Sequence, residues 1–295
     1  MTAVVLEGKT LGKQIESQVA EDVRRLGREG VTPCLTVVLV GVDAASGIYV
    51  AGKERACKRL GVASKTVRLP AATTQGELVS VLTDLNRDPA VHGILVQLPL
   101  PSHIDTNSIL CTISPAKDVD GFTPENMGRL LLGFPYTVPC TPAGVLALLD
   151  HAGVSIGGLD VVIIGRSNIV GKPLAAMLMQ KAEKRNCTVT VCHSATRNIQ
   201  LLTARADLVV TAMGSPRFLK AAMVKPGATV VDVGINRVRD PSAEKGYTLV
   251  GDADFGPISE KAAYITPVPG GVGPLTVAML LKNTVKVARY LACTP

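Results

Sequence analysis

The sequence contains no tryptophan, and aromatic residues make up only 3% of its 295 residues. Few ring faces are therefore available for stacking on unpaired bases, which argues against a protein that binds single-stranded nucleic acid. The formal net charge is +7, but the lysines and arginines are dispersed and form no basic run. This mild positive excess favours small anionic ligands such as nucleotides over nucleic acid.

Patterns typical of metal sites, hydrolase nucleophiles and membrane spans are also missing. The seven cysteines form no CxxC pair, the four histidines lack zinc-ligand spacing, and no GxSxG motif occurs. Apolar runs stay far below the ~20 residues that cross a bilayer, and the first residues, MTAVVLEGKTLG, do not resemble a secretory signal. The sequence therefore predicts a cytoplasmic chain with reduced thiols, no metal and no membrane contact.

Apolar segments alternate with amphipathic ones along the whole chain. Strands are predicted over residues 34–41, 65–70, 91–101, 159–165, 187–194, 206–214 and 228–236, and helices over 46–61, 76–88, 171–184 and from Pro274 onward. Strands that alternate with helices form parallel sheets, and ligands bind beyond the carboxyl ends of such strands. We therefore predict an α/β protein with two domains around a cleft, the second a Rossmann-like doubly wound parallel sheet.

One lysine lies where a core residue is expected. In the predicted helix 46–61, which Ser46 would cap and Gly61 would end, the apolar face contains Lys53. Its neighbours on that face are Tyr49, Val50, Ala56, Cys57 and Leu60. The ammonium could extend past the apolar residues to water, or it could be held at the wall of a binding site with Tyr49 one turn away.

The segment VVIIGRSNIVGKP has the pattern of a strand, a glycine turn and a helix. Gly165, Ser167 and Gly171 lie in the turn, although they do not match the G-x-G-x-x-G motif of dinucleotide sites. A helix N-terminus after such a turn favours phosphate binding. A purely structural turn is the alternative.

The end of the following strand distinguishes NAD from NADP. An NAD site carries an acidic residue there, which binds the ribose 2′-hydroxyl. Residues 192–197, CHSATR, include no acid. Arg166 in the glycine turn and Ser194 instead suit a 2′-phosphate, so the sequence predicts NADP as the cofactor.

Seven blocks of sequence, in order over nearly the whole chain, resemble one family. They are YVAGKERACKRLGV, GILVQLPLP, PAKDVDGF, PCTPAGV, VVIIGRSNIVGKPLAAML, TVCHSAT and ITPVPGGVGPLTVAMLL. In these blocks the chain is similar to the bifunctional methylenetetrahydrofolate dehydrogenase/methenyltetrahydrofolate cyclohydrolase family. The resemblance implies NADP-dependent oxidation of 5,10-methylenetetrahydrofolate to 5,10-methenyltetrahydrofolate, followed by hydrolysis to 10-formyltetrahydrofolate.

The resemblance also implies roles for individual residues. Lys53, Gln97 and Asp120 match the catalytic set, in which Gln97 is the hydrogen-bonding partner of the lysine and Asp120 binds the pterin. Tyr49 matches an aromatic residue that packs on the folate. The other matches are Gly270, Gly271 and Thr276 near the substrate, and Gly165, Arg166, Ser167, Ser194 and Ile235 at the cofactor.

Simpler interpretations remain open for several of these residues. Asp120 could form an ordinary Asp-Gly turn, Tyr49 could pack in the core, and the segment 267–276 could serve only as a connector. Asp118 and Asp252 are interpreted as structural residues.

The predicted domains differ in role. The folate-binding catalytic domain comprises residues 1–147 and a returning helix, 275–295, and the NADP-binding domain comprises residues 148–274. The resemblance implies a homodimer and a folate substrate that can carry a polyglutamate tail. Two other functions fit the pattern: another NADP-dependent oxidoreductase similar to shikimate dehydrogenase, or an NADP-binding regulator without catalysis. The first does not explain Gln97 or the KDVDGF and PGGVGP blocks, and the second predicts no folate turnover.

Overall fold

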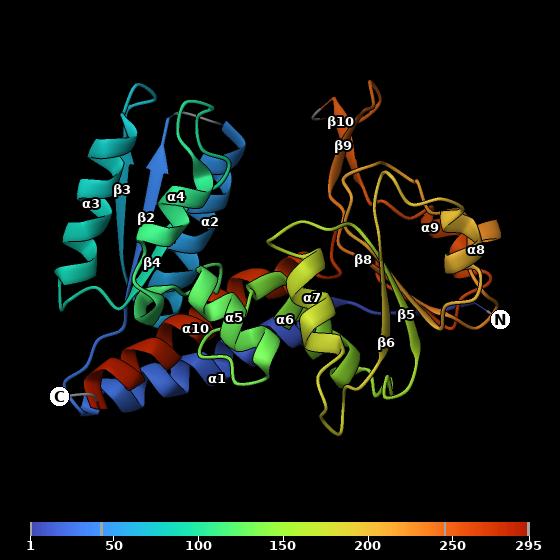
Figure 1. The fold of residues 1–295 in the computed structure, drawn as a ribbon, viewed down its shortest axis with the longest axis horizontal. Helices are drawn as coiled ribbons and strands as arrows, with labels where there is room; N and C mark the ends of the chain where they lie inside the picture. Colours follow the sequence, from blue (N-terminus) through green and yellow to red (C-terminus); the bar gives the residue numbers. More distant parts are fainter. Residues whose placement is uncertain (1, 42–43, 245, 294–295) are drawn as a thin grey trace. The chain divides into compact units, whose positions relative to one another are not determined.

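The computed structural model of this chain describes residues 2–41, 44–244 and 246–293, without the side chains of residues 44–46, 48 and 49. The chain divides into two compact units. Two long helices, α1 (Gly8–Arg28) and α10 (Gly273–Cys293), contribute residues to both units (Figure 1).

The three-stranded unit comprises residues 13–140 and those from 277 onward, and its parallel sheet has the order β3-β2-β4. Its elements are β2 (Cys34–Val40), α2 (Ala44–Leu60), β3 (Ala63–Leu69), α3 (Gln75–Arg87), β4 (Gly93–Val96), α4 (Thr106–Thr112), η1 (Pro115–Lys117) and α5 (Pro124–Leu132). Val38 and Val40 of β2 pack in one apolar cluster with α3 and α4. Because the strand order reverses at β2, the carboxyl ends of β2 and β4 form a switch point, where ligands commonly bind.

The six-stranded unit comprises the residues up to 12 and residues 141–276, and its parallel sheet has the order β1-β11-β8-β7-β5-β6. Its strands are β1 (Val4–Val5), β5 (Asp160–Ile164), β6 (Thr188–Cys192), β7 (Leu208–Thr211), β8 (Thr229–Asp232) and β11 (Tyr264–Ile265), with an antiparallel hairpin of β9 (Asn236–Arg239) and β10 (Tyr247–Val250). Its helices are α6 (Cys140–His151), α7 (Gly171–Leu178), α8 (Ile199–Thr203), η2 (Ala221–Met223) and α9 (Phe255–Ser259).

Helices lie on both faces of the six-stranded sheet. On one side α7 contacts β5 and β6, and on the other side α8 and α9 pack in a cluster with Val162 and Ile164 of β5 (Figure 1). The predicted Rossmann-like doubly wound sheet is therefore confirmed. Its switch point lies at the carboxyl ends of β5 and β7.

Two predicted helix boundaries are wrong. The helix predicted over 171–184 ends at Leu178, because the chain turns back and Cys187 N donates to the carbonyl of Leu178. The helix around Lys53 begins at Ala44, so Ser46 lies inside it and does not cap it. Among the described residues, no helix combines the length and apolar character needed to cross a membrane.

The compact units differ from the predicted domain boundaries at the N-terminal segment and at residues 141–147. β1 pairs in parallel with β11 at the edge of the six-stranded sheet. Gly144 of α6 lies against Leu275, where a Cβ on the glycine would approach the leucine Cβ to 2.9 Å. Both segments therefore pack within the six-stranded unit.

Candidate active site

Lys53 and Gln97 come from different elements of the three-stranded unit and meet directly. Lys53 lies in α2, and Gln97 follows β4 at the switch point of the sheet. Lys53 Nζ donates to Gln97 Oε1 at 2.9 Å, and Gln97 Nε2 donates to the carbonyl of Leu98 at 2.8 Å. Because an amide is neutral, it orients the ammonium without neutralising it. The half-buried ammonium therefore has a fixed partner and does not simply extend to water.

Asp120 lies in the loop between η1 and α5 of the same unit. Burial raises the pKa of its carboxyl to about 6, against a lowering by the Lys53 ammonium and a further raising by Asp118. The Cys140 thiol donates to Asp120 Oδ1 over a long 3.8 Å. A half-buried carboxylate with such weak support gains stability when a ligand brings paired N–H donors.

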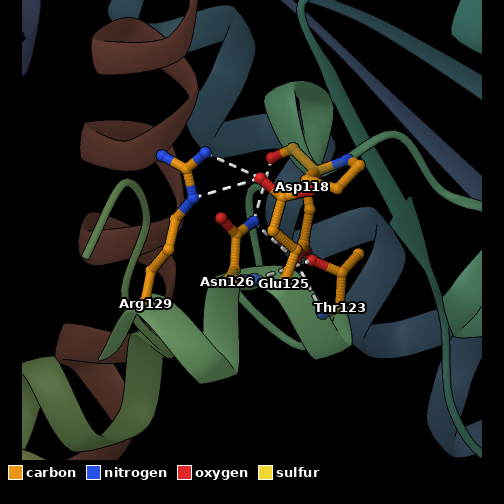
Figure 2. A network of polar contacts seen from close by, with 6 residues as sticks. Asp118, Thr123, Glu125, Asn126 and Arg129 are labelled. Carbon is orange, nitrogen blue, oxygen red and sulfur yellow. Dashed lines mark hydrogen bonds and ion pairs between the residues drawn. The ribbon is translucent and has the colours of Figure 1, made fainter. Parts of the chain in front are cut away.

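Asp118, two residues earlier, has a different environment. It is 1% exposed, and its carboxylate accepts hydrogen bonds from Gly121 N (2.9 Å), Thr123 N (2.8 Å) and Asn126 Nδ2 (3.0 Å). Figure 2 shows Asp118 with Thr123 and Asn126 at the start of α5. Gly121 has a φ of +72°, a conformation that favours glycine. Asp118 thus folds the turn that carries Asp120, which supports its interpretation as a structural residue.

The other residues predicted to lie near the substrate fall into two groups. Tyr49 precedes Lys53 by one turn of α2, but its side chain lies outside the described residues. Gly270, Gly271 and Thr276 belong to the six-stranded unit. The carbonyl of Gly270 accepts a hydrogen bond from Gly8 N at 2.9 Å, and a Cβ on Gly271 would lie 2.7 Å from a backbone oxygen. The loop before α10 is therefore closely packed against its own unit.

The glycine turn after β5 leaves no room for side chains at two positions. Gly165 has a φ of +134°, and a Cβ there would collide with the carbonyl oxygen of Ala212. A Cβ on Gly171 would collide with the carbonyl oxygen of Gly165. Ser167 Oγ accepts a hydrogen bond from Val170 N at 3.1 Å and thereby orders the entry to α7. The turn presents exposed backbone at the switch point, as a phosphate site requires.

The remaining cofactor candidates lie at neighbouring positions of the same unit. Gly165 N donates to the carbonyl of Cys192 at 2.9 Å, which places the glycine turn beside the end of β6. Arg166 and Ser194 are both exposed at these two strand ends. Ile235 is 47% exposed and lies beside the first residue of α10, where a Cβ on Gly273 would be 3.8 Å from Ile235 Cδ1.

Two buried carboxylates, Asp232 and Asp252, lie in the same unit as the cofactor candidates. Sequence reasoning interpreted Asp252 as structural but missed Asp232. Asp252 accepts hydrogen bonds from the backbone N–H groups of residues 213–215, at 2.8–3.0 Å, and from Asn236 Nδ2 at 2.8 Å. Asp232 accepts hydrogen bonds from Thr211 Oγ1 at 3.0 Å and from Ala253 N at 2.7 Å. The pKa of Asp232 is raised above its ordinary value, because the effect of burial exceeds the lowering by these hydrogen bonds. The signal was present in VVDVG, an acid directly after an apolar strand.

These observations define the class of the protein. A Rossmann-like sheet with a glycine turn is linked to an α/β unit in which a lysine, an amide and an under-supported carboxylate gather. Within the described residues, no group of three or more His, Cys, Asp or Glu is arranged to hold a metal ion. The class is that of a two-domain, nucleotide-binding enzyme.

Comparisons with known proteins give the family. Residues 6–120 match the tetrahydrofolate dehydrogenase/cyclohydrolase catalytic domain, and residues 139–292 match the NAD(P)-binding domain of the same family. Bifunctional protein FolD of Moorella thermoacetica is 50% identical over 289 residues, which cover 98% of this chain and 100% of the relative. The chain therefore belongs to the tetrahydrofolate dehydrogenase/cyclohydrolase family, a family of bifunctional enzymes.

Solved structures agree with this assignment. The bifunctional FolD enzyme of Campylobacter jejuni has a TM-score of 0.92 at 48% identity, covering 98% of this chain and 99% of that one. The Trypanosoma brucei enzyme, solved with NADP and an inhibitor, has a TM-score of 0.93 at 42% identity, covering both chains fully (100%). Shikimate 5-dehydrogenase of Thermus thermophilus is 15% identical with a TM-score of 0.52, covering 87% of this chain and 99% of that one. That likeness shows the fold alone, and the predicted bifunctional folate family is confirmed.

Proposed function

We propose that the chain oxidises 5,10-methylenetetrahydrofolate with NADP+ and then hydrolyses 5,10-methenyltetrahydrofolate to 10-formyltetrahydrofolate. The observation that carries this proposal is the 2.9 Å hydrogen bond from Lys53 Nζ to Gln97 Oε1, with the Asp120 carboxylate in the same unit, in a member of this family. When bound, NADP+ supplies the hydride acceptor.

Asp120 binds the pterin. The pterin presents adjacent N–H donors on a guanidine-like edge, and one carboxylate can accept both of them. The raised pKa of Asp120 in the free protein fits this role, because such donors stabilise the charged form that burial disfavours.

Lys53 acts mainly in the hydrolytic step. Hydride transfer needs little acid–base help, whereas ring opening moves protons between the attacking water and the departing nitrogen. Lys53 relays these protons and orients folate during the first step, while Gln97 holds its amine in place. Tyr49 offers a flat face on which the folate ring system packs.

The six-stranded unit binds the dinucleotide. The backbone around Gly165 and Ser167 receives phosphate, and Arg166 and Ser194 bind the 2′-phosphate that distinguishes NADP from NAD. The NADP-bound relative from Trypanosoma brucei supports this choice. Ile235 contacts the nicotinamide, and Gly270, Gly271 and Thr276 lie near the ligands.

The protein acts as a cytoplasmic homodimer on folates that can carry polyglutamate tails. The seven cysteines, each a free thiol in the structure, support a reducing compartment, and the net charge of +7 suits an anionic tail. Sedimentation analysis tests the dimer, and a monomeric protein with full activity would reject it. Comparison of KM for mono- and pentaglutamyl substrates tests the tail.

One spectrophotometric assay tests the main proposal. Purified protein is mixed with NADP+ and methylenetetrahydrofolate, and the methenyl absorbance is followed as it rises and decays. We expect a transient methenyl signal together with NADPH. A protein that binds NADP+ but produces no methenyl signal would reject the dehydrogenase assignment and favour a non-catalytic regulator.

A further inference from the structure

An amide from the last helix holds the backbone next to Asp120. Asn283 of α10 is 6% exposed, and its Nδ2 donates to the carbonyl oxygens of Val119 and Val138, each at 2.8 Å. Because both acceptors are carbonyl oxygens, the nitrogen and not the oxygen of the amide must face them. Two segments that are not adjacent in sequence therefore share one anchor.

Both anchored carbonyls lie close in sequence to a residue that sets the position of the Asp120 carboxylate. The Val119 carbonyl belongs to the peptide that joins Val119 to Asp120, so holding it fixes the direction in which the Asp120 side chain leaves the backbone. Val138 lies two residues before Cys140, whose thiol donates to Asp120 Oδ1 at 3.8 Å and to the Val119 carbonyl at 3.6 Å. Cys140 Sγ is itself 3.7 Å from Asn283 Nδ2.

We propose that Asn283 is a positioning residue for folate binding and acts through Asp120. This inference rests on the proposed role of Asp120 at the pterin. The backbone that carries Asp120 is therefore held on both sides. Asp118 binds the N–H groups of Gly121 and Thr123 after it, and Asn283 binds the Val119 carbonyl before it. A small displacement of the carboxylate matters because it must meet two N–H donors at once. The competing explanation is that Asn283 only satisfies two buried carbonyl groups and contributes stability.

The test separates positioning from stability by the Michaelis constants. Asn283→Leu removes both N–H donors and keeps the branching of the side chain at Cγ. The matched control is Thr284→Val, at the next residue of the same helix, because Thr284 is 0% exposed and its hydroxyl bonds only to the Leu280 carbonyl within α10, at 2.9 Å, in the described contacts. KM does not depend on the concentration of active enzyme, so poor folding alone lowers the apparent kcat and leaves KM unchanged.

We expect Asn283→Leu to raise KM for methylenetetrahydrofolate at least fivefold and to leave KM for NADP+ within twofold of the wild-type value. Thr284→Val should leave both constants unchanged. A Leu variant with a wild-type folate KM, or with both KM values raised equally, would overturn the inference. Asn283→Ser, whose shorter hydroxyl cannot reach both carbonyls, should also raise the folate KM, and it decides the question if the Leu variant does not fold.

Asp120→Asn, measured in parallel, shows whether the role of Asp120 or only that of Asn283 fails. If Asp120→Asn leaves the folate KM unchanged, the proposed role of Asp120 fails. If Asp120→Asn raises that KM and the Asn283 variants do not, only the positioning role of Asn283 fails.

Discussion

The two carboxylates of one turn, Asp118 and Asp120, differ in the hydrogen-bond donors that the fold gives them. Asp118 accepts three hydrogen bonds from N–H groups of its own loop and helix. Asp120 meets a thiol at 3.8 Å and has a pKa raised to about 6 by burial. A buried carboxylate that fixed donors satisfy organises the chain, whereas a half-buried one that lacks them costs folding free energy, which the N–H donors of a ligand would offset. Asp252 in the other unit, with its four N–H donors, belongs with Asp118.

The largest expected effect concerns Lys53, whose ammonium lowers the pKa of Asp120. Lys53→Met should lower the rate of methenyltetrahydrofolate hydrolysis by about 10²–10⁴-fold, the range typical of a lost general acid–base group. Lys58→Met, at an exposed lysine of the same helix, is the matched control and should retain full activity. The decay of the methenyl absorbance measures both variants, and undiminished ring opening in the Lys53 variant would remove Lys53 from the mechanism.

Asp118→Asn should destabilise the fold, because Asp118 is the carboxylate that organises the turn. The Asn amide has only one oxygen to accept hydrogen bonds, and its NH2 group would face N–H donors that now bond to the carboxylate. Buried N–H groups would therefore lose their acceptors. We expect the free energy of unfolding to fall by about 3 kcal/mol, as measured by urea denaturation. A variant as stable as the wild type would contradict the view that Asp118 organises the turn.

Asp120→Asn should act in the opposite direction on stability. Because the folded-state pKa of about 6 lies above the ordinary value of 3.8, the folded state binds more protons between these values, and wild-type stability falls as the pH rises through that window. The Asn variant should therefore be more stable than the wild type at pH 7, by about 1–3 kcal/mol. The difference should shrink as the pH falls and disappear at about pH 3 and below, under the ordinary value of 3.8, where the carboxyl is largely protonated in both states. Thermal denaturation at the two pH values checks this, and a destabilised variant at pH 7 would place Asp120 with Asp118.

The smallest expected effect extends the comparison to an exposed charge in the other unit. Arg166→Gln should raise KM for NADP+ about tenfold, the loss of roughly 1.4 kcal/mol expected for one charge-assisted contact, and leave any activity with NAD+ unchanged. The ratio of activities with the two cofactors is the measurement. An equal loss with both cofactors would mean that Arg166 does not read the 2′-phosphate.

Local patterns in the sequence were sufficient to predict the alternating α/β elements, the glycine turn at Gly165 and the unusual position of Lys53. These features depend on short-range periodicity, which a single sequence displays directly. Other features depend on contacts between distant segments and left no local signal. The two-residue strand β1 is defined by its partner β11, and Asn283 on an otherwise ordinary helix gave no indication that it bonds to Val119. The prediction of Ser46 as the N-cap was wrong because α2 begins two residues earlier, at Ala44.

The three-stranded unit is assembled from two separated lengths of chain, because α10 enters it only from residue 277 onward. During synthesis, residues 13–140 leave the ribosome long before Asn283 does. The carbonyls of Val119 and Val138 therefore lack their donor, the Asn283 amide, until almost the whole sequence has been translated. A fragment that stops at residue 140 would retain Lys53, Gln97 and Asp120 but would lack the Asn283 amide that holds the aspartate loop, so the proposed folate site would be completed last.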